Sequence, residues 1–188
     1  EMQVMSIMSD TDVLEAMEKG EIKVEPFERS LLGPDSLDIR LGNEMLISKG
    51  IGKTIDSSKP ENFFESRKMD GSFTLEPRQF VLGTTMERIS LSDCVAAQIE
   101  GRSSLGRLGI MVHMTAGIIH TGFGAKSPSA LTLEIYSVNP NSVLLRAGMK
   151  IAQLSFFRLG TKASRGYDYM PTSKYVSQNS PLPPKAEK

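Results

Sequence analysis

The sequence is short of the residues that build disulfides and metal cages. Its 188 residues include one cysteine, two histidines and no tryptophan. The single cysteine, Cys94, can form neither an intrachain disulfide nor a cysteine-based metal site. Apolar runs of membrane-spanning length are missing, and the first residues lack the basic segment and apolar stretch of a signal peptide. We therefore expect a soluble, cytoplasmic protein with no membrane partner.

Neither sign of charge is in excess. Lysine and arginine together number 22, aspartate and glutamate together also number 22, and the formal net charge is +0. A balanced chain creates no global field that attracts nucleic acid or anionic lipid, so any basic site must be local. The chain is 39% hydrophobic, and its length suffices for a domain with its own core. We expect a single domain over 1–188 and no nucleic-acid partner.

The first part of the sequence predicts a short helix after a frayed start. Residues 1–8 carry no clear pattern, and we expect a flexible N-terminus there. Ser9 and Asp12 have the spacing of a capping box, and Gly20 can end the last turn of a helix. These signals predict a helix over 9–19.

A strand and a long loop are expected next. Residues 37–41 alternate between apolar and charged side chains before Gly42, which predicts a strand that ends there. Asp38 and Arg40 share one face of this strand, where charged residues are more often solvated or paired than catalytic. Residues 48–70 are rich in Gly, Lys, Ser and Pro, and this composition predicts a long loop.

Short apolar segments with turn signals between them recur through the rest of the chain. They are 73–75, 80–82, 95–99, 110–114, 131–136, 143–145 and 151–157. Many short strands with little helix are typical of a β-barrel or a jelly-roll sandwich. We therefore expect a mainly β fold with a short N-terminal helix and few other helices. Residues 164–188 are polar and proline-rich, a composition that indicates either a disordered tail or a lid.

One stretch concentrates side chains suited to a charged ligand. Two arginines and two serines lie among glycines between residues 100 and 107: Arg102, Ser103, Ser104 and Arg107. Guanidinium and hydroxyl groups donate hydrogen bonds to oxyanions, and glycine lets a ligand approach the backbone. The stretch is compatible with a phosphate-binding site, although a surface turn with solvated charges has the same composition.

Several sequence blocks occur in a characteristic order: GPDSLDIRLGN, GRSSLGRLG, HMTAGIIHTGF, LTLEIY, AGMKIAQLSF and SKYVSQ. In this order they resemble the blocks of the dCTP deaminase family, which is related to the trimeric dUTPases. The resemblance covers nearly the whole chain apart from the first few residues, 48–70 and the end of the tail. It implies a dUTPase-like distorted β-barrel, and a homotrimer with sites at the subunit interfaces.

The resemblance also implies an activity, the hydrolytic deamination of dCTP to dUTP and ammonia, in the synthesis of precursors of dUMP and dTTP. Water attacks C4 of cytosine, N3 receives a proton and ammonia leaves. Glu134 would be the general base and acid. The hydroxyl of Ser103 and the backbone carbonyl of Ala116 would position the water, and Arg107 would stabilise charge near the reacting centre.

Further positions are implied to bind the nucleotide. They are Arg102, Ser104, His120, Tyr167, Lys174 and Gln178. Magnesium would be held mainly by the triphosphate oxygens of the substrate, which fits a sequence without a carboxylate cluster. Nucleobase deaminases of the zinc type need His and Cys ligands, and this chain has neither a C-x-x-C nor an H-x-E pattern. We therefore expect no zinc.

Two departures from the family pattern bear on the site. His120 stands where the family usually carries an aspartate that holds the sugar 3′-hydroxyl and, in dUTPases, helps to activate water. A neutral imidazole can bond to a hydroxyl but supplies no fixed negative charge, so dUTP hydrolysis is the less expected activity. Residues 123–134 are also about four residues longer than usual, which we interpret as a loop insertion of modest entropic cost. Extra residues inside the strand would misplace Glu134.

Other functions stay open at this stage. Gly117 resembles the bifunctional branch that converts dCTP directly to dUMP, and a dUTP diphosphatase is a related alternative. A regulator that binds nucleotide without turnover and a purely structural trimeric barrel are further alternatives. The sequence does not decide whether dUTP or dTTP also binds. His113 lies in an apolar segment and is expected in the core or the wall of a pocket rather than in catalysis.

Overall fold

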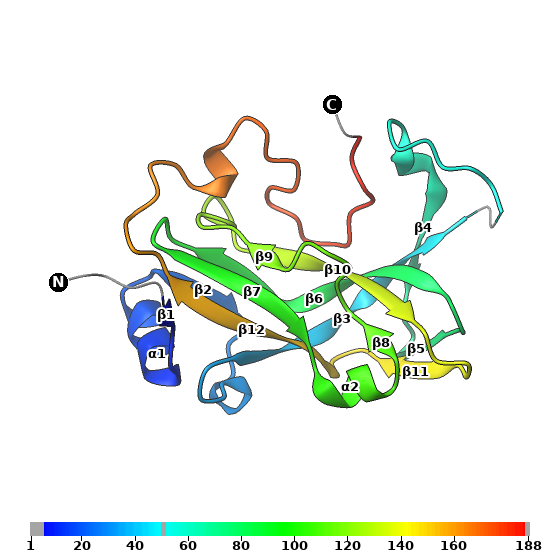
Figure 1. Cartoon of the computed structure of the whole chain (residues 1–188), viewed down its shortest axis with the longest axis horizontal. Coiled ribbons are helices and arrows are strands. Elements are labelled where there is room, and N and C mark those ends of the chain that lie inside the picture. The colour runs from blue at the N-terminus through cyan, green and yellow to red at the C-terminus, as the bar shows by residue number, and fades with distance from the viewer. Residues whose placement is uncertain (1–5, 50–51, 187–188) are drawn as a thin grey trace.

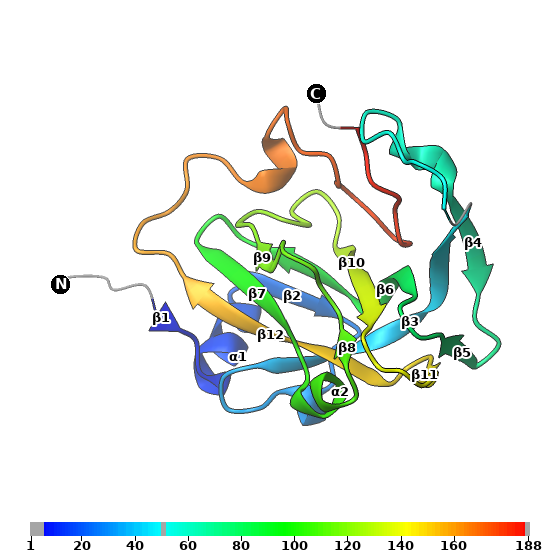
Figure 2. The ribbon, with the colours of Figure 1, turned by 45° about the vertical axis from the view of Figure 1, so that its right-hand side comes forward.

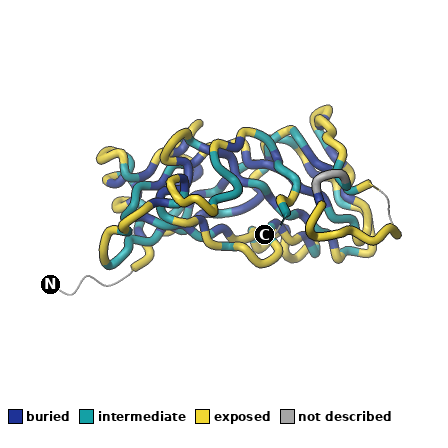
Figure 3. Tube along the Cα trace, turned by 90° about the horizontal axis from the view of Figure 1, so that it is seen from above, coloured by how far each residue is buried: buried dark blue, intermediate teal, exposed yellow. Residues whose placement is uncertain are grey.

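The structure, a computed structural model, describes residues 6–49 and 52–186. Within these ranges a ten-stranded sheet curls around the core, and a two-stranded sheet lies beside one end of it (Figure 1). The predicted mainly β class with a short N-terminal helix is confirmed. Seen from above, buried residues run through the middle of the molecule and exposed residues occupy the turns (Figure 3).

The large sheet has the order β8-β10-β6-β3-β12-β7-β9, with β1 on β12, β2 on β6 and β4 on β3. Its strands are β1 (Ser6–Ile7), β2 (Ile22–Glu25), β3 (Leu37–Ser48), β4 (Phe64–Lys68), β6 (Phe80–Leu91), β7 (Val95–Gly101), β8 (Ile110–Met111), β9 (Ile118–Ile119), β10 (Ser129–Ser137) and β12 (Lys150–Arg158). The small sheet pairs β5 (Ser72–Leu75) with β11 (Val143–Arg146). The helices are α1 (Asp10–Glu18) and α2 (Ser103–Arg107), with 3-10 turns η1 (Arg29–Leu31), η2 (Pro60–Phe63) and η3 (Tyr167–Tyr169).

Helix α1 begins as the sequence predicts. The Ser9 hydroxyl accepts a hydrogen bond from the Asp12 backbone N–H at 3.2 Å, and the Asp12 carboxylate accepts one from the Ser9 N–H at 2.9 Å. This reciprocal pair is a capping box. Residues 6–8 differ from the predicted flexible start, because β1 pairs with β12 and Met8 is buried. Residues 1–5 of that prediction lie outside the described residues.

Strand β3 is longer than its sequence signals indicate. Gly42 does not end it, since β3 runs on to Ser48. A Cβ atom at position 42 would lie 2.6 Å from Cγ2 of Thr84. The glycine therefore permits a close approach of β3 and β6 where their register shifts. The predicted loop 48–70 is wrong in its second half, since β4 pairs with β3 through residues such as Phe64 opposite Ser48.

Strand β10 lies between β8 and β6 and contains the apolar segment 131–136 that predicted a strand. Leu133 and Ile135 are fully buried in the core, whereas Thr132 and Glu134 on the other side of the strand are partly exposed. Loop residues fill the chain from the end of β9 to Pro128, and pairing with β6 starts at Ser129, with a register shift between Ala130 and Thr132. From Thr132 to Tyr136 the pairing is continuous, with Glu134 opposite Leu82.

The C-terminal tail returns across the open side of the curled sheet. After β12 the chain passes through η3, descends toward β10 and ends near β4, as both ribbon views show (Figures 1 and 2). Helix α2 lies at the opposite edge of the molecule. The fold thus covers one side of β10 with the tail of the same chain.

Candidate active site

A cavity of about 530 Å³ lies between β10, the segment after β8 and the tail. Its lining is mostly apolar and aromatic, with a few polar groups. The lining residues are Phe64, Phe80, Leu82, Ile99, His113, Met114, Thr115, Ala116, Ile118, Ile119, His120, Phe123, Leu131, Thr132, Glu134, Tyr167, Tyr175, Gln178, Leu182 and Pro184. Such a lining suits a small organic ligand whose orientation is set by few polar contacts.

Glu134 is the carboxylate of this cavity. Its side chain leaves β10 on the face opposite the buried Leu133 and Ile135. Oε2 accepts a hydrogen bond from the Met114 backbone N–H at 2.8 Å, while Oε1 accepts none from the described part of the chain. One oxygen is therefore fixed by the backbone, and the other is available to a water molecule or a substrate proton.

The segment that holds Glu134 also supplies one wall. Met114, Thr115 and Ala116 line the cavity, so Ala116 lies where the sequence predicts it, in the same cavity as Glu134. The Gly117 carbonyl accepts a hydrogen bond from the Ile99 N–H at 2.8 Å, which ties this segment to β7. The backbone of the segment is thus anchored on both of its sides.

His113 lies in the cavity wall, as expected from its apolar surroundings. Its Nε2 is 3.5 Å from Oε2 of Glu100, and its Nδ1 is buried without a hydrogen-bond partner among the described residues. A Cβ atom on Gly117 would lie 3.4 Å from Cε1 of this ring. The small residue at 117 therefore leaves room for the imidazole.

His120 and Tyr167 form one end of the cavity. Their rings are stacked with a centroid separation of 5.9 Å and an interplanar angle of 10°. Phe123 packs against the same tyrosine with a centroid separation of 6.0 Å. The two predicted binding residues are therefore brought together, although one comes from the loop after β9 and the other from η3.

The tail closes the cavity through contacts with β10. The backbone N–H of Ala130 donates to the Gln178 carbonyl at 3.0 Å, and Nε2 of Gln178 donates to the Ala130 carbonyl at 2.6 Å. The hydroxyl of Thr132 lies 3.5 Å from Oε1 of Gln178 and accepts a hydrogen bond from the Leu182 N–H at 3.3 Å. Gln178 is consequently buried beside the strand that carries Glu134.

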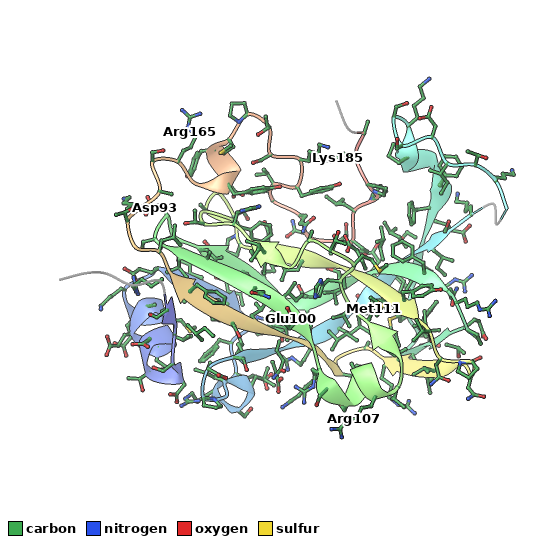
Figure 4. The ribbon with its side chains drawn as sticks, in the orientation of Figure 1. Asp93, Glu100, Arg107, Met111, Arg165 and Lys185 are labelled. Carbon is green, nitrogen blue, oxygen red and sulfur yellow. The ribbon has the colours of Figure 1, made fainter. Side chains whose placement is uncertain are left out.

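The arginine and serine cluster lies elsewhere. Ser103, Ser104 and Arg107 belong to α2, with Arg102 as its N-cap, and none of the four lines the cavity. Arg107 points away from the sheet at the edge opposite the tail residues Arg165 and Lys185 (Figure 4). Within one chain the structure therefore does not bring these predicted groups to Glu134.

Arg102 is held by a carboxylate that our sequence analysis placed on a paired or solvated face. Asp38 on β3 forms an ion pair with Arg102, and its Oδ2 is 2.9 Å from Nζ of Lys150. Nε2 of Gln153 also donates to Asp38 at 3.1 Å. Burial alone would raise the pKa of Asp38, but hydrogen bonds from Lys150 and Arg102 outweigh it and hold the pKa below its ordinary value.

Lys174 is outside the cavity lining, and its backbone carbonyl accepts a hydrogen bond from Nζ of Lys185. Thr132 and Phe64 are among the lining residues that sequence analysis did not assign to the site. Thr132 shares the face of Glu134, so strand alternation could have found it. Phe64 comes from β4, in a segment predicted to be a loop, and no signal in the sequence points to it.

The donor set bears on the choice of metal. In the described ranges, no three side chains of the His, Cys, Asp and Glu types are grouped so as to hold a metal ion. A magnesium ion here would need oxygen ligands from its nucleotide.

No described helix has the length and apolar character needed to span a bilayer.

Comparisons with known proteins identify the relatives of this fold and cavity. A family model described as dCTP deaminase-like matches residues 7–159. A "dCTP deaminase, dUMP-forming" of Aquifex aeolicus is 41% identical, over 94% of this chain and 93% of the relative. A "dCTP deaminase" of Haloarcula marismortui is 40% identical, over 93% of this chain and 92% of the relative.

A solved structure is also similar. The 2′-deoxycytidine 5′-triphosphate deaminase of Agrobacterium tumefaciens matches 82% of this chain with a TM-score of 0.64 and 22% identity. The match spans only 47% of that longer chain. At this level of identity the similarity supports the fold alone.

Proposed function

Because this chain belongs to the dCTP deaminase-like family, we propose that it catalyses the hydrolytic deamination of dCTP, with Glu134 as the proton-transferring group. The observation that carries the proposal is the position of Glu134. Its carboxylate is in a largely apolar cavity, one oxygen is fixed by the Met114 N–H, and the other is available. A general base needs this combination of a fixed position and an open oxygen.

The reaction transfers protons around one carbon of the base. Glu134 takes a proton from a water molecule while the water oxygen bonds to C4 of cytosine, and Glu134 delivers a proton to N3. A proton from the new C4 hydroxyl then passes to the amino group. The bond between C4 and the amino nitrogen breaks, which releases ammonia and leaves a uracil base. One carboxylate can relay these protons because it alternates between its two protonation states. Ala116 lines the same cavity, and its backbone carbonyl would accept a hydrogen bond from the attacking water.

The sugar and the tail of the nucleotide need further groups. His120 would bond to the 3′-hydroxyl of the sugar, next to the stacked ring of Tyr167. The tail from 164 onward acts as a lid, since Gln178 closes against β10 beside Glu134. Lys174, in this tail, contributes positive charge toward the phosphates.

The triphosphate is held by a second copy of the chain. Arg102, Ser103, Ser104 and Arg107 cannot complete the cavity of their own chain, because α2 lies at the opposite edge (Figure 2). In a homotrimer with sites between subunits, α2 of one chain would meet the cavity of the next. Arg107 and Ser103 would then stabilise charge and position water, while Arg102 and Ser104 would grip the phosphates. Magnesium, bound through the triphosphate, would neutralise part of its charge.

A second candidate differs in the product. The relative from Aquifex aeolicus is named "dCTP deaminase, dUMP-forming". The resemblance of Gly117 to the bifunctional branch, noted in the sequence analysis, favours the same product. His120 supports the first candidate, dUTP, because it supplies no fixed carboxylate to activate a second water.

One incubation separates the candidates. The purified protein is mixed with dCTP and magnesium, and ammonia, dUTP, dUMP and diphosphate are measured separately. Ammonia with dUTP supports deamination alone, whereas ammonia with dUMP and diphosphate supports the bifunctional enzyme. Nucleotide binding without any product would contradict both and would indicate a regulator, and the absence of binding would indicate a structural protein.

The role of His120 is tested by His120→Asp. If the imidazole serves only the sugar hydroxyl, this variant keeps deamination and gains diphosphate release. His120→Asn is the matched control, because it keeps hydrogen bonding without a carboxylate. Loss of ammonia release in both variants would show that the histidine has another role.

A further inference from the structure

The start of the tail is fastened to the loop after β9 by a set of contacts that the proposed function does not assign. We infer that loop residues 121–126 clamp residues 166–169, and that Asp168 is the positioning residue that holds Tyr167 against His120. We call these two segments the clamp. The inference depends on the proposed function only in its last step, where Tyr167 and His120 contact the nucleotide.

The loop side of the clamp is fixed to the barrel. The Thr121 hydroxyl and the Gly122 N–H both donate to the Ser92 carbonyl, at 2.8 and 3.0 Å. The Leu91 N–H donates to the Phe123 carbonyl at 2.8 Å. These bonds connect the loop to the end of β6 and the turn after it, so the loop can serve as a fixed support for the tail.

The tail side is held by backbone contacts. The Tyr167 N–H donates to the Thr121 carbonyl at 2.8 Å, and the Asp168 N–H donates to the Gly122 carbonyl at 3.3 Å. A Cβ atom on Gly122, whose φ is +75°, would lie 2.3 Å from Cα of Gly166. Glycine at 122 therefore allows the two backbones to touch.

Asp168 adds a side-chain hydrogen bond across this junction. It is only 2% exposed, and its Oδ2 accepts a hydrogen bond from the Lys126 backbone N–H at 3.0 Å. Oδ1 has no partner among the described residues. A buried carboxyl group is costly without hydrogen bonds, so losing this bond would leave the side chain without a described partner. Above the junction, Nζ of Lys126 is 5.3 Å from the ring centroid of Tyr169.

The clamp determines where Tyr167 points. Tyr167 lies between Gly166, which touches Gly122, and Asp168, whose N–H is bonded to Gly122. Its ring is stacked on His120, and its hydroxyl accepts a hydrogen bond from the Tyr175 N–H at 3.4 Å. Tyr175 leads on to Gln178, which closes against β10. Asp168 thus acts through Tyr167 on the cavity and on the path of the tail, without contacting a ligand itself.

Amide hydrogen exchange of the unliganded wild-type protein tests the clamp without any assumption about activity. The N–H groups of Lys126, Tyr167 and Asp168 should share one opening free energy, below that of β10. Free exchange at Lys126 while Tyr167 is protected would overturn the clamp. This measurement decides the matter even if substituted proteins fail to fold.

Substitutions test the positioning role of Asp168. Asp168→Ala removes the acceptor, and we expect tail amides to exchange about tenfold faster and KM for dCTP to rise about tenfold, with kcat changed less than threefold. Asp168→Asn keeps an acceptor for the Lys126 N–H and should restore both quantities to within about threefold of the wild type. Asp93→Ala is the matched control, because Asp93 contacts Lys162 just before the tail with an exposed ion pair of 2.9 Å; it should change neither quantity.

The outcomes separate the two proposals. Unchanged exchange in Asp168→Ala overturns the clamp, whatever the activity. Faster exchange with unchanged KM retains the clamp but refutes the positioning of Tyr167. Absence of dCTP turnover in the wild type refutes the proposed function, and the exchange measurements on the clamp still stand.

Discussion

The cavity around Glu134 and the cluster on α2 are built in opposite ways. Glu134 is on β10, which is paired on both sides; its carboxylate is held by the Met114 N–H and covered by the tail of its own chain. Arg107 is exposed on the five-residue helix α2, and Arg102 is tied to Asp38 by an ion pair. In the described part of one chain, the carboxylate and the cations therefore lie apart, because none of the cluster residues lines the cavity. This separation is the reason for our proposal that the cations serve the cavity of another copy.

Glu134→Gln is the sharpest change on the cavity side. The amide keeps the shape of the side chain but cannot relay a proton, so we expect kcat for ammonia release to fall about 10²- to 10⁴-fold. Nucleotide affinity should be nearly unchanged, and calorimetric titration with dCTP measures it. Turnover close to that of the wild type would mean that another group is the base.

Arg107→Ala is the corresponding change on the α2 side. Removing a charged donor near the reacting centre should lower kcat/KM about 10²-fold. Arg107→Lys is the control that keeps the charge but loses the planar fork, and we expect it to recover only part of the activity. Steady-state kinetics with dCTP provides the comparison. Full activity in Arg107→Ala would remove α2 from the site.

Asp38→Asn tests whether dCTP binding by Arg102 depends on the ion pair that Arg102 forms with Asp38. Loss of the carboxylate frees Arg102 and Lys150, and we expect KM for dCTP to change several-fold with little change in kcat.

The same variant has a pH signature. Because the folded-state pKa of Asp38 is lowered, its contribution to stability is present above its unfolded pKa of about 4 and is lost as pH falls through the folded value. The difference in denaturation midpoint between wild type and variant should therefore shrink below about pH 4. A difference that grows on acidification would contradict this assignment.

Thr132→Val should have the smallest effect. It removes the hydroxyl that contacts Gln178 and Leu182, at distances of 3.5 and 3.3 Å, and these long bonds contribute little. We expect KM to rise about two- to threefold and tail amides to exchange slightly faster. Thr132→Ser keeps the hydroxyl and should match the wild type. A large loss of kcat in Thr132→Val alone would show that the residue takes part in the chemistry.

Sequence patterns predicted local elements well. The apolar segment 131–136 indicated the strand that carries Glu134, and capping signals located α1, because both patterns are local in the sequence. Patterns failed where a contact between distant segments decides the structure. Gly42 continues a strand because β6 packs against it, and β4 forms because β3 offers it an edge.

The α2 side shows a different limit. Arg102 and Arg107 are recognisable in sequence as candidate phosphate ligands, but their spacing from Glu134 does not tell which cavity they reach. Only the fold shows that neither arginine lines the cavity of its own chain, which contains Glu134. The stacking of His120 on Tyr167 was equally hidden, since it depends on how the tail returns.

Subunit complementation tests the shared site most directly. Glu134→Gln and Arg107→Ala chains, each with its own tag, are produced together, and oligomers that carry both tags are isolated. If each site combines Glu134 of one subunit with Arg107 of its neighbour in a trimer, each isolated mixed oligomer has one intact site in three and should show about a third of the wild-type activity, far above either variant alone. Mixed oligomers no more active than the parent variants would contradict the account.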